Sequence, residues 1–416
     1  MTMIAGVAKV DITPPIGLEL SGYGYYRNRK STGISDALYS KAIVLSDGTT
    51  RVAIVSNDLI GLPKEVTKKV REEVSKETGI PKENILLACT HTHSGPATIY
   101  LRGCGEVDKD YLRVLPKYIA GAIIAANSRL QDAKIGAGKG YVDGISLNRE
   151  VENGPNDPEV GVIRVDDAND NVIATITNFS CHPVVMPVNS LISGDYPGTA
   201  TSFLEKAIEG SISMFLQGAC GDINPILKKT GKVRRVGISL AAEALKVEEQ
   251  IQTTQKTLIK SKIQNVKLPL DIPRREDAEV ILSKVERFFG KKLEKVYAEW
   301  IKSMIKKIET NPKPWLNTEI QAIRIGDILL VAEPAELYVK FGLEIKRRSK
   351  YKNTFVVGFS NDYVGYIPDE EDYAKNDGFG SYAARVVPVL RDNFFYKPEV
   401  GKIIVEATLR LINNLS

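Results

Sequence analysis

Short apolar runs alternate with longer amphipathic segments along most of the chain. Continuous apolar runs at 51–59 and 84–90 predict buried strands, and the charged segment 64–78 between them has helical spacing, so the three together predict a β–α–β unit. The alternation then continues toward the last residues. Further helices are expected at 108–129, 199–209, 232–252, 335–349 and 400–411, and further strands at 160–165, 172–178, 213–218, 320–325, 328–332 and 354–358.

This alternation predicts an α/β fold, in which a mostly parallel or mixed central sheet is covered by helices in a three-layer α/β/α arrangement. We expect residues 1–416 to form a single domain. The composition changes near the middle: 257–271 alternates like an extended strand, and 274–310 is rich in Lys, Glu and aromatic residues at helical spacing. We interpret 270–312 as an inserted helical segment or cap. Its charge is better explained by a solvated face than by a partner-binding role.

Composition and charge exclude several classes of protein. The chain is 43% hydrophobic, which is enough for a core, and 56 Lys and Arg against 51 Asp and Glu give a net charge of only +5 without a basic tract. We therefore expect no nucleic-acid partner. No apolar run reaches the roughly 18 residues of a membrane span, and no leader peptide is evident, so a cytoplasmic protein is expected. The four scattered cysteines fit reduced thiols. The sequence leaves open whether the protein forms a homo-oligomer.

Histidine is scarce, and its placement is informative. The chain has three histidines: His91 and His93 lie in the motif CTHTHSGP, and His182 lies in NFSCHP, each directly after a predicted strand. Residues i and i+2 of an extended chain share a face, so His91 and His93 can point into one site. Strand ends are where open α/β sheets place functional groups, and imidazole is the commonest neutral zinc ligand. The pattern favours a metal site over histidines that only cap backbone groups.

Two histidine ligands do not complete a zinc site, so one or two oxygen ligands are needed from elsewhere in the chain. Glu336 follows the strand expected at 328–332 and is predicted to open a helix, while Asp222 follows the strand expected at 213–218. Asp58 ends the first predicted strand and could orient a ligating imidazole. Each of these acids alone is more typical of a helix cap or a surface charge.

A set of short motifs occurs in order along nearly the whole chain. It comprises DITPP at 11–15, GYG at 22–24, DALYSKAIVL at 36–45, HTHSGP at 91–96, NR at 148–149, DPEVG at 157–161, NFSCHP at 178–183, GDINP at 221–225, PAE at 334–336 and SNDYVGYI at 360–367. The ordered set resembles the N-terminal catalytic domain of the neutral/alkaline (non-lysosomal) ceramidase family.

The resemblance implies a zinc hydrolase that cleaves an N-acyl amide, ceramide-like or smaller, with zinc-activated water. It implies one Zn²⁺ per chain, held by His91, His182, Glu336 and Tyr366. It also places His93, Arg149 and Tyr382 where the family has groups that contact the scissile amide and its oxyanion. For Asp222 two roles stay open: orienting the attacking water or a proton relay, and a purely structural role in its turn.

The chain also departs from the family pattern. Asn224, which we keep among the catalytic candidates, stands where ceramidases carry a serine in the GDxSP segment. We expect no C-terminal β-sandwich domain and no secretion signal, which makes ceramide in a bilayer a poor substrate. Two other functions stay open: a zinc-dependent esterase or lactonase of a small molecule, and a non-catalytic metal-binding protein with a closed coordination shell.

Overall fold

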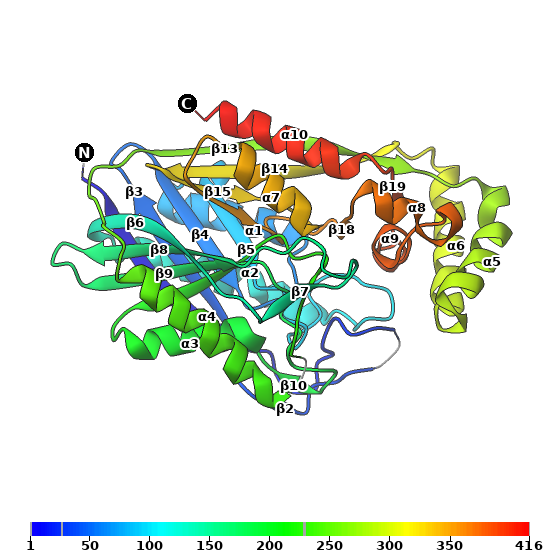
Figure 1. The fold of residues 1–416 in the computed structure, drawn as a ribbon, viewed down its shortest axis with the longest axis horizontal. Helices are drawn as coiled ribbons and strands as arrows, with labels where there is room; N and C mark the ends of the chain where they lie inside the picture. The colour runs from blue at the N-terminus through cyan, green and yellow to red at the C-terminus, as the bar shows by residue number, and fades with distance from the viewer. Residues whose placement is uncertain (1, 26–27, 228–229, 416) are drawn as a thin grey trace.

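The computed structural model describes residues 2–25, 28–227 and 230–415, and its strands form two main sheets (Figure 1). The larger sheet has eight strands in the order β11-β9-β8-β6-β1-β3-β4-β5, and the smaller has five in the order β17-β15-β14-β13-β19. The strands of the larger sheet are β1 (Ile4–Asp11), β3 (Tyr39–Ser46), β4 (Arg51–Asn57), β5 (Ile85–Cys89), β6 (Gln131–Tyr141), β8 (Glu159–Asp167), β9 (Val172–Phe179) and β11 (Ile212–Gln217). Those of the smaller are β13 (Ile259–Asp271), β14 (Trp315–Ile325), β15 (Ile328–Ala332), β17 (Asn353–Val357) and β19 (Phe395–Tyr396).

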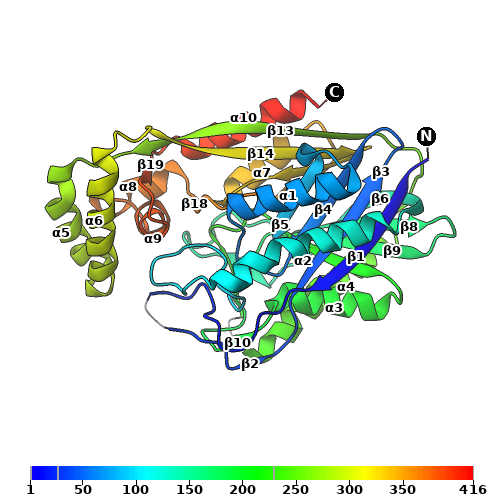
Figure 2. The ribbon, with the colours of Figure 1, turned by 180° about the vertical axis from the view of Figure 1, so that it is seen from behind.

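The two sheets pack face to face through one apolar core, to which Ile54 and Ile176 contribute from the larger sheet and Leu330 and Phe355 from the smaller. Helices lie on the outer sides (Figures 1 and 2): α1 to α4 pack against the larger sheet, and α7 and α10 against the smaller. The predicted α/β class with a mixed sheet is confirmed, and the central layer consists of two sheets. These helices are α1 (Lys64–Thr78), α2 (Lys109–Asn127), α3 (Asp195–Ala207), α4 (Val233–Glu248), α7 (Val339–Arg348) and α10 (Val400–Asn413).

The predicted β–α–β unit is present, because β4 and β5 pair in parallel and α1 spans the expected residues 64–78. In the larger sheet β9 and β11 are also parallel, whereas β1, β3, β6 and β8 pair with their neighbours in antiparallel fashion. The sheet has two halves that meet at β1 and β6, where the ladder joins only Ile4 to Asp132 and Ala5 to Gln131.

Strand β6 was not expected from the hydrophobic pattern, because it is rich in glycine. Its glycines face α4: a Cβ on Gly138 would lie 2.9 Å from the Val247 side chain, and one on Gly140 only 2.5 Å from it. The glycines are therefore required because the helix lies so close to the strand. They also replace the alternating apolar side chains from which a strand is predicted in a sequence.

The expected start of the helix at 335–349 is wrong. Glu336–Leu337 forms a short strand, β16, which pairs in parallel with β18 (Tyr366–Ile367), and α7 begins only at Val339. The amide of Glu336 donates to the carbonyl of Gly365 at 3.0 Å. The backbone at Glu336 therefore pairs with a neighbouring segment and does not form a helical turn.

Residues 270–312 contain two helices, α5 (Ala278–Phe289) and α6 (Glu294–Glu309), which stand at one end of the molecule (Figure 2). The inner side of α6 is buried: the Tyr297 hydroxyl donates to the carbonyl of Arg385 at 2.9 Å, and the Trp300 indole donates to that of Asn393 at 2.8 Å. The expected solvated face accounts for only one side of the pair. The other side packs near α8 (Glu370–Gly378), the π-helical turn η5 (Tyr382–Val386) and α9 (Val387–Leu390).

No helix among the described residues is long and apolar enough to cross a membrane. All four cysteines are buried, and none of them is in a disulfide.

Substitution of Gly161 by Ala is expected to destabilise the packing between the sheets, because the added Cβ would lie 2.4 Å from Cε1 of Phe355. We expect a loss of about 1–3 kcal/mol in the free energy of unfolding, measured by urea denaturation. Gly121→Ala in α2 is the matched control: its Cβ would meet nothing within 4 Å, and it should stabilise by about 0.5–1 kcal/mol. Equal effects of the two substitutions would contradict the close contact.

Glu333→Gln is expected to flatten the pH dependence of stability. Glu333 is fully buried, its Oε1 accepts a hydrogen bond from Thr408 at 2.6 Å, and Oε2 has no partner among the described residues. Burial raises the pKa of Glu333 from 4.5 to about 8, so the folded protein holds a proton that the unfolded chain loses at lower pH. Stability of the wild type should therefore fall between pH 4.5 and 8 relative to the variant, by at most about 1.4 kcal/mol per pH unit.

The measurement is the melting temperature of both proteins as a function of pH. Glu371→Gln, which removes an exposed carboxylate on α8, is the control for general charge effects. Parallel curves for wild type and Glu333→Gln would show that Glu333 titrates normally.

Candidate metal centre and active site

His91 stands two residues beyond the end of β5 in a left-handed backbone conformation, with φ +67°. This conformation is uncommon for a residue with a side chain and is kept by the surrounding contacts. The amide of His91 donates to the carbonyl of Leu59 at 2.9 Å, and Nδ1 lies 2.7 Å from the carbonyl oxygen of Ile60. A carbonyl can only accept, so Nδ1 carries the proton and Nε2 presents a bare lone pair.

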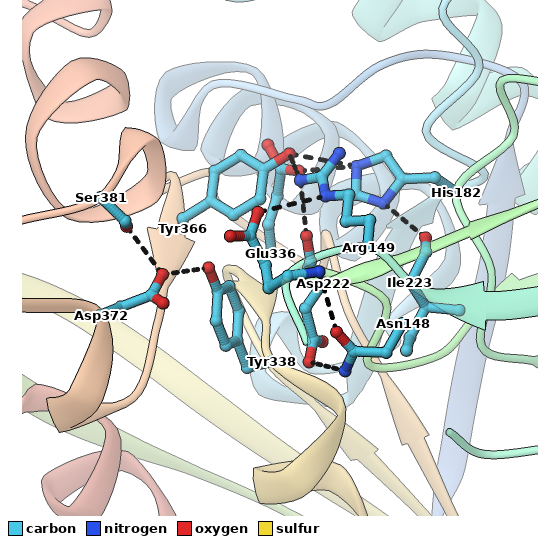
Figure 3. Close-up of polar contacts among 12 residues, drawn as sticks. Asn148, Arg149, His182, Asp222, Ile223, Glu336, Tyr338, Tyr366, Asp372 and Ser381 are labelled. Atoms are coloured by element: carbon cyan, nitrogen blue, oxygen red, sulfur yellow. Dashed lines mark hydrogen bonds and ion pairs between the residues drawn. The ribbon is translucent and has the colours of Figure 1, made fainter. Parts of the chain in front are cut away.

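His182 follows β9 and is held in the same way. Its Nδ1 lies 3.2 Å from the carbonyl oxygen of Ile223 (Figure 3). It also lies 2.6 Å from that of Cys220, which again leaves Nε2 unprotonated. Burial lowers the pKa of His182 to about 4, against a smaller opposing effect of Glu336, so the imidazole is neutral at pH 7.

The carboxylate of Glu336 lies between these two imidazoles. Its Oε2 is 3.0 Å from Nε2 of His182 and 3.3 Å from Nε2 of His91, while Oε1 accepts a hydrogen bond from the Tyr363 hydroxyl. Three electron-pair donors thus converge without a proton between them, which fits a bound cation.

Tyr366 adds a fourth donor atom, its phenol oxygen. The β16–β18 ladder pairs it directly with Glu336, and its hydroxyl lies 3.2 Å from Nε2 of His182 (Figure 3). Arg149 donates from one guanidinium nitrogen to the Tyr366 hydroxyl at 2.7 Å and to the carbonyl of Gly221 at 2.7 Å. Burial raises the pKa of Tyr366 and the guanidinium opposes that rise, so positive charge beside the phenol favours its ligand form.

His93 completes a histidine cluster. Its Nε2 lies 3.2 Å from Nε2 of His91, and the ligand nitrogens of His91, His93 and His182 lie within 4.8 Å of one another, close enough to hold a metal ion. Burial lowers the pKa of His93 well below its ordinary value. The ring packs on the backbone of Gly22, where φ is +88° and a Cβ would lie 2.5 Å from Nδ1 of His93, so only glycine fits there. That Nδ1 has no partner among the described residues.

These residues open into a cavity of about 60 Å³. Its polar part is formed by the histidines His91 and His93, by Glu336 and by the tyrosines 23, 363, 366 and 382. Tyr382 is 39% exposed, so the cavity reaches the surface beside it. The rest of the wall is apolar and includes Leu101, Cys104, Val387 and Leu390.

The structure brings the predicted ligands His91, His182, Glu336 and Tyr366 together, with His93, Arg149 and Tyr382 around them. The ring of Tyr382 lies 6.4 Å from that of Tyr366, centroid to centroid.

Asp222 and Asn224 are placed differently. The Asp222 carboxylate accepts from the amide of Val339 at 2.7 Å and from Asn148 Nδ2 at 2.8 Å, and burial raises its pKa to about 6 (Figure 3). These contacts favour the structural role that the sequence left open. Asn224 lies in β12 (Ile223–Pro225), which pairs with β7 (Ser146–Asn148); it is buried, does not line the cavity, and its Oδ1 has no partner among the described residues.

The expected role of Asp58 in orienting a ligating imidazole is wrong. Its carboxylate accepts from the amide of Tyr39 at 2.9 Å, whereas His91 is oriented by the carbonyl of Ile60. Sequence reasoning also missed Tyr363. The available signal was its position in the same short motif as Tyr366, three residues earlier.

Comparison with known proteins decides the family. The family model described as "Neutral/alkaline non-lysosomal ceramidase, N-terminal" matches residues 3–234, which is more than half of the chain. This chain belongs to the neutral/alkaline non-lysosomal ceramidase family. That membership confirms the prediction of a ceramidase-like enzyme of the class that hydrolyses carbon–nitrogen bonds.

Relatives of this ceramidase family member are distant. Neutral ceramidase from Pseudomonas aeruginosa is 26% identical over 89% of this chain and 68% of its own length, and neutral ceramidase A from Dictyostelium discoideum is 30% identical over 53% of this chain but only 35% of its own. The crystal structure of the Pseudomonas enzyme shares the fold, with a TM-score of 0.77 at 22% identity, over 100% of this chain and 75% of that one. A ceramidase complexed with C2 gives a TM-score of 0.78 at 21% identity, covering 76% of that chain.

Tyr363→Phe is expected to weaken metal binding about 10–100-fold, because it removes the hydroxyl that holds the second oxygen of Glu336. The measurement is zinc affinity by competition with a chromogenic chelator. Tyr111→Phe is the control, since it deletes a buried hydroxyl that binds the carbonyl of Ile12 outside this site. An unchanged affinity in Tyr363→Phe would show that this hydrogen bond does not position Glu336.

Proposed function

We propose that this chain is a zinc-dependent amidase that hydrolyses an N-acyl amide, ceramide-like or smaller. One Zn²⁺ would be held by His91, His182, Glu336 and Tyr366. The observation that carries the proposal is the convergence of Nε2 of His91 and of His182 on Oε2 of Glu336, at 3.3 and 3.0 Å, with both imidazole protons directed to main-chain carbonyls. Nitrogen and oxygen donors of this kind suit zinc.

When bound, zinc polarises a carbonyl oxygen and lowers the pKa of water from about 16 to about 7. The residues around the zinc would bind the substrate, stabilise the developing charge and transfer the proton. Arg149 is a partly buried cation beside Tyr366 and is placed to hold a polar or anionic part of the substrate. Tyr382 keeps its proton at neutral pH because a phenol ionises only at about pH 10, so its hydroxyl can donate to the carbonyl oxygen as negative charge develops there.

His93 is the candidate for moving the proton. It is neutral because burial lowers its pKa, and its Nδ1 has no partner among the described residues. We propose that it takes the proton from the attacking water and passes it to the leaving amine. Asp222 would act indirectly, by holding the turn that carries the carbonyls of Cys220 and Ile223 against His182. A cytoplasmic location remains a prediction from the sequence.

Replacing His182 by Ala should abolish stoichiometric zinc and lower kcat/KM for N-acyl amides about a thousandfold or more, because the metal contributes several kcal/mol to the rate. The measurements are metal content by elemental analysis and hydrolysis of acetyl to dodecanoyl amides, with and without a chelator. Arg149→Met is the comparison variant: it keeps all four ligand residues, so it should retain more zinc than His182→Ala while it loses rate.

Zinc and activity retained in His182→Ala would contradict the ligand assignment. Chelator-sensitive cleavage of esters or lactones without any cleavage of amides would contradict the proposed bond. Stoichiometric zinc without turnover on any of these substrates would move the function to metal binding alone.

A further inference from the structure

The apolar wall of the cavity is built from two separate segments. Leu101 and Cys104 come from the loop that follows the histidine motif, and Val387 and Leu390 come from α9. The main chains of the two segments are joined directly, because the amide of Arg102 donates to the carbonyl of Leu390 at 2.6 Å. The distance between these segments therefore sets the room beside the metal ligands.

Both segments are held by one carboxylate. Asp392 ends the turn after α9 with φ +55°, and its Oδ1 accepts a charge-assisted hydrogen bond from the Arg102 guanidinium. The side chain of Arg102 is only 12% exposed and that of Asp392 25%, so this ion pair is better shielded than an ordinary surface pair.

The inserted helix α6 holds the same carboxylate from the other side. Ser303 donates to Oδ2 of Asp392 at 2.8 Å, and the Lys307 ammonium donates to the same oxygen at 2.8 Å. Trp300, which is 1% exposed, donates from its indole to the next carbonyl, that of Asn393, at 2.8 Å. The helical pair therefore braces the turn that carries the pocket wall. We call Arg102, Ser303, Lys307 and Asp392 the Asp392 junction.

We propose that Asp392 is a positioning residue that fixes the width of the acyl pocket and so restricts the enzyme to short acyl groups. This inference rests on the proposed amidase function and names its substrate class. A cavity of 60 Å³ has room for about four to six water molecules at 10–15 Å³ each, and the metal ligands share it, so it leaves room for an acyl group of only a few carbons. A longer chain that stays against this wall needs the two segments to separate, and the Asp392 junction opposes their separation.

The test compares acetyl, butanoyl, octanoyl and dodecanoyl anilides on the zinc-loaded full chain. The wild type is expected to prefer acetyl or butanoyl. Asp392→Asn should raise the octanoyl-to-butanoyl ratio of kcat/KM about tenfold. This is the lower end of the change in kcat/KM that one methylene group causes in a closely fitting pocket. Lys307→Met removes one donor from α6 and should shift the ratio in the same direction by less. Lys306→Met is the matched control. Lys306 precedes Lys307 on α6, is exposed, and forms no ion pair among the described residues.

A second readout separates loosening of the wall from a general loss of structure. In a Trp315→Phe background Trp300 is the single tryptophan, and its fluorescence should shift to the red in Asp392→Asn while the cooperative melt is retained. If Asp392→Asn does not fold, the same two measurements, the chain-length ratio and the tryptophan fluorescence, are made on Lys307→Met.

Failure of this inference differs from failure of the proposed function. A wild type that cleaves the dodecanoyl and acetyl anilides equally well, or an unchanged chain-length ratio in both variants, would overturn the inference and leave an amidase. If no anilide is cleaved, the proposed function fails. The width of the pocket is then tested by calorimetric binding of acetate, butanoate and octanoate to the zinc-loaded protein, where octanoate binding as tightly as acetate would overturn the inference.

Discussion

A buried carboxylate oxygen that faces two unprotonated imidazole nitrogens is the constraint on which this site depends. Each imidazole directs its proton to a main-chain carbonyl, of Ile60 for His91 and of Cys220 for His182, so neither can donate to Glu336. Burying such acceptors together without a cation is unfavourable. The positions of those carbonyls, and of the turns that carry them, are therefore part of the binding site.

Face-to-face packing of the two sheets delivers the ligands to one place. His91 and His182 follow β5 and β9 of the larger sheet, whereas Glu336 and Tyr366 follow β15 and β17 of the smaller. The parallel pairing of β16 with β18 then puts Glu336 and Tyr366 side by side. A change in the packing between the sheets would move two ligands relative to the other two, so the core controls the geometry of the site as well as the stability of the fold.

The elements best predicted from sequence were those with a strong period, such as α1 and the apolar strands β4 and β5. The histidine motifs were predictable because rare residues at strand ends are conspicuous. Strand β6 was not, since its glycines replace side chains with space for α4.

Hydrogen bonds between residues far apart in the sequence could not be predicted either. The Tyr363 hydroxyl on Glu336, the carbonyl of Ile60 on His91 and the direction of the Asp222 carboxylate all depend on turns whose path follows from tertiary packing. Residue type and spacing identified Asp58 and Asp222 as acids at strand ends, but could not tell which group each of them faces.

The narrow junction of the larger sheet would give a bound metal a mechanical role. The two halves share a backbone ladder only at Ile4 and Ala5 of β1, and His91 belongs to one half while His182 belongs to the other. An ion bound by both histidines is thus a cross-link between two halves of a sheet that few backbone hydrogen bonds join. Metal supply would then govern the rigidity of the whole β layer, because binding to the native state alone stabilises it by mass action.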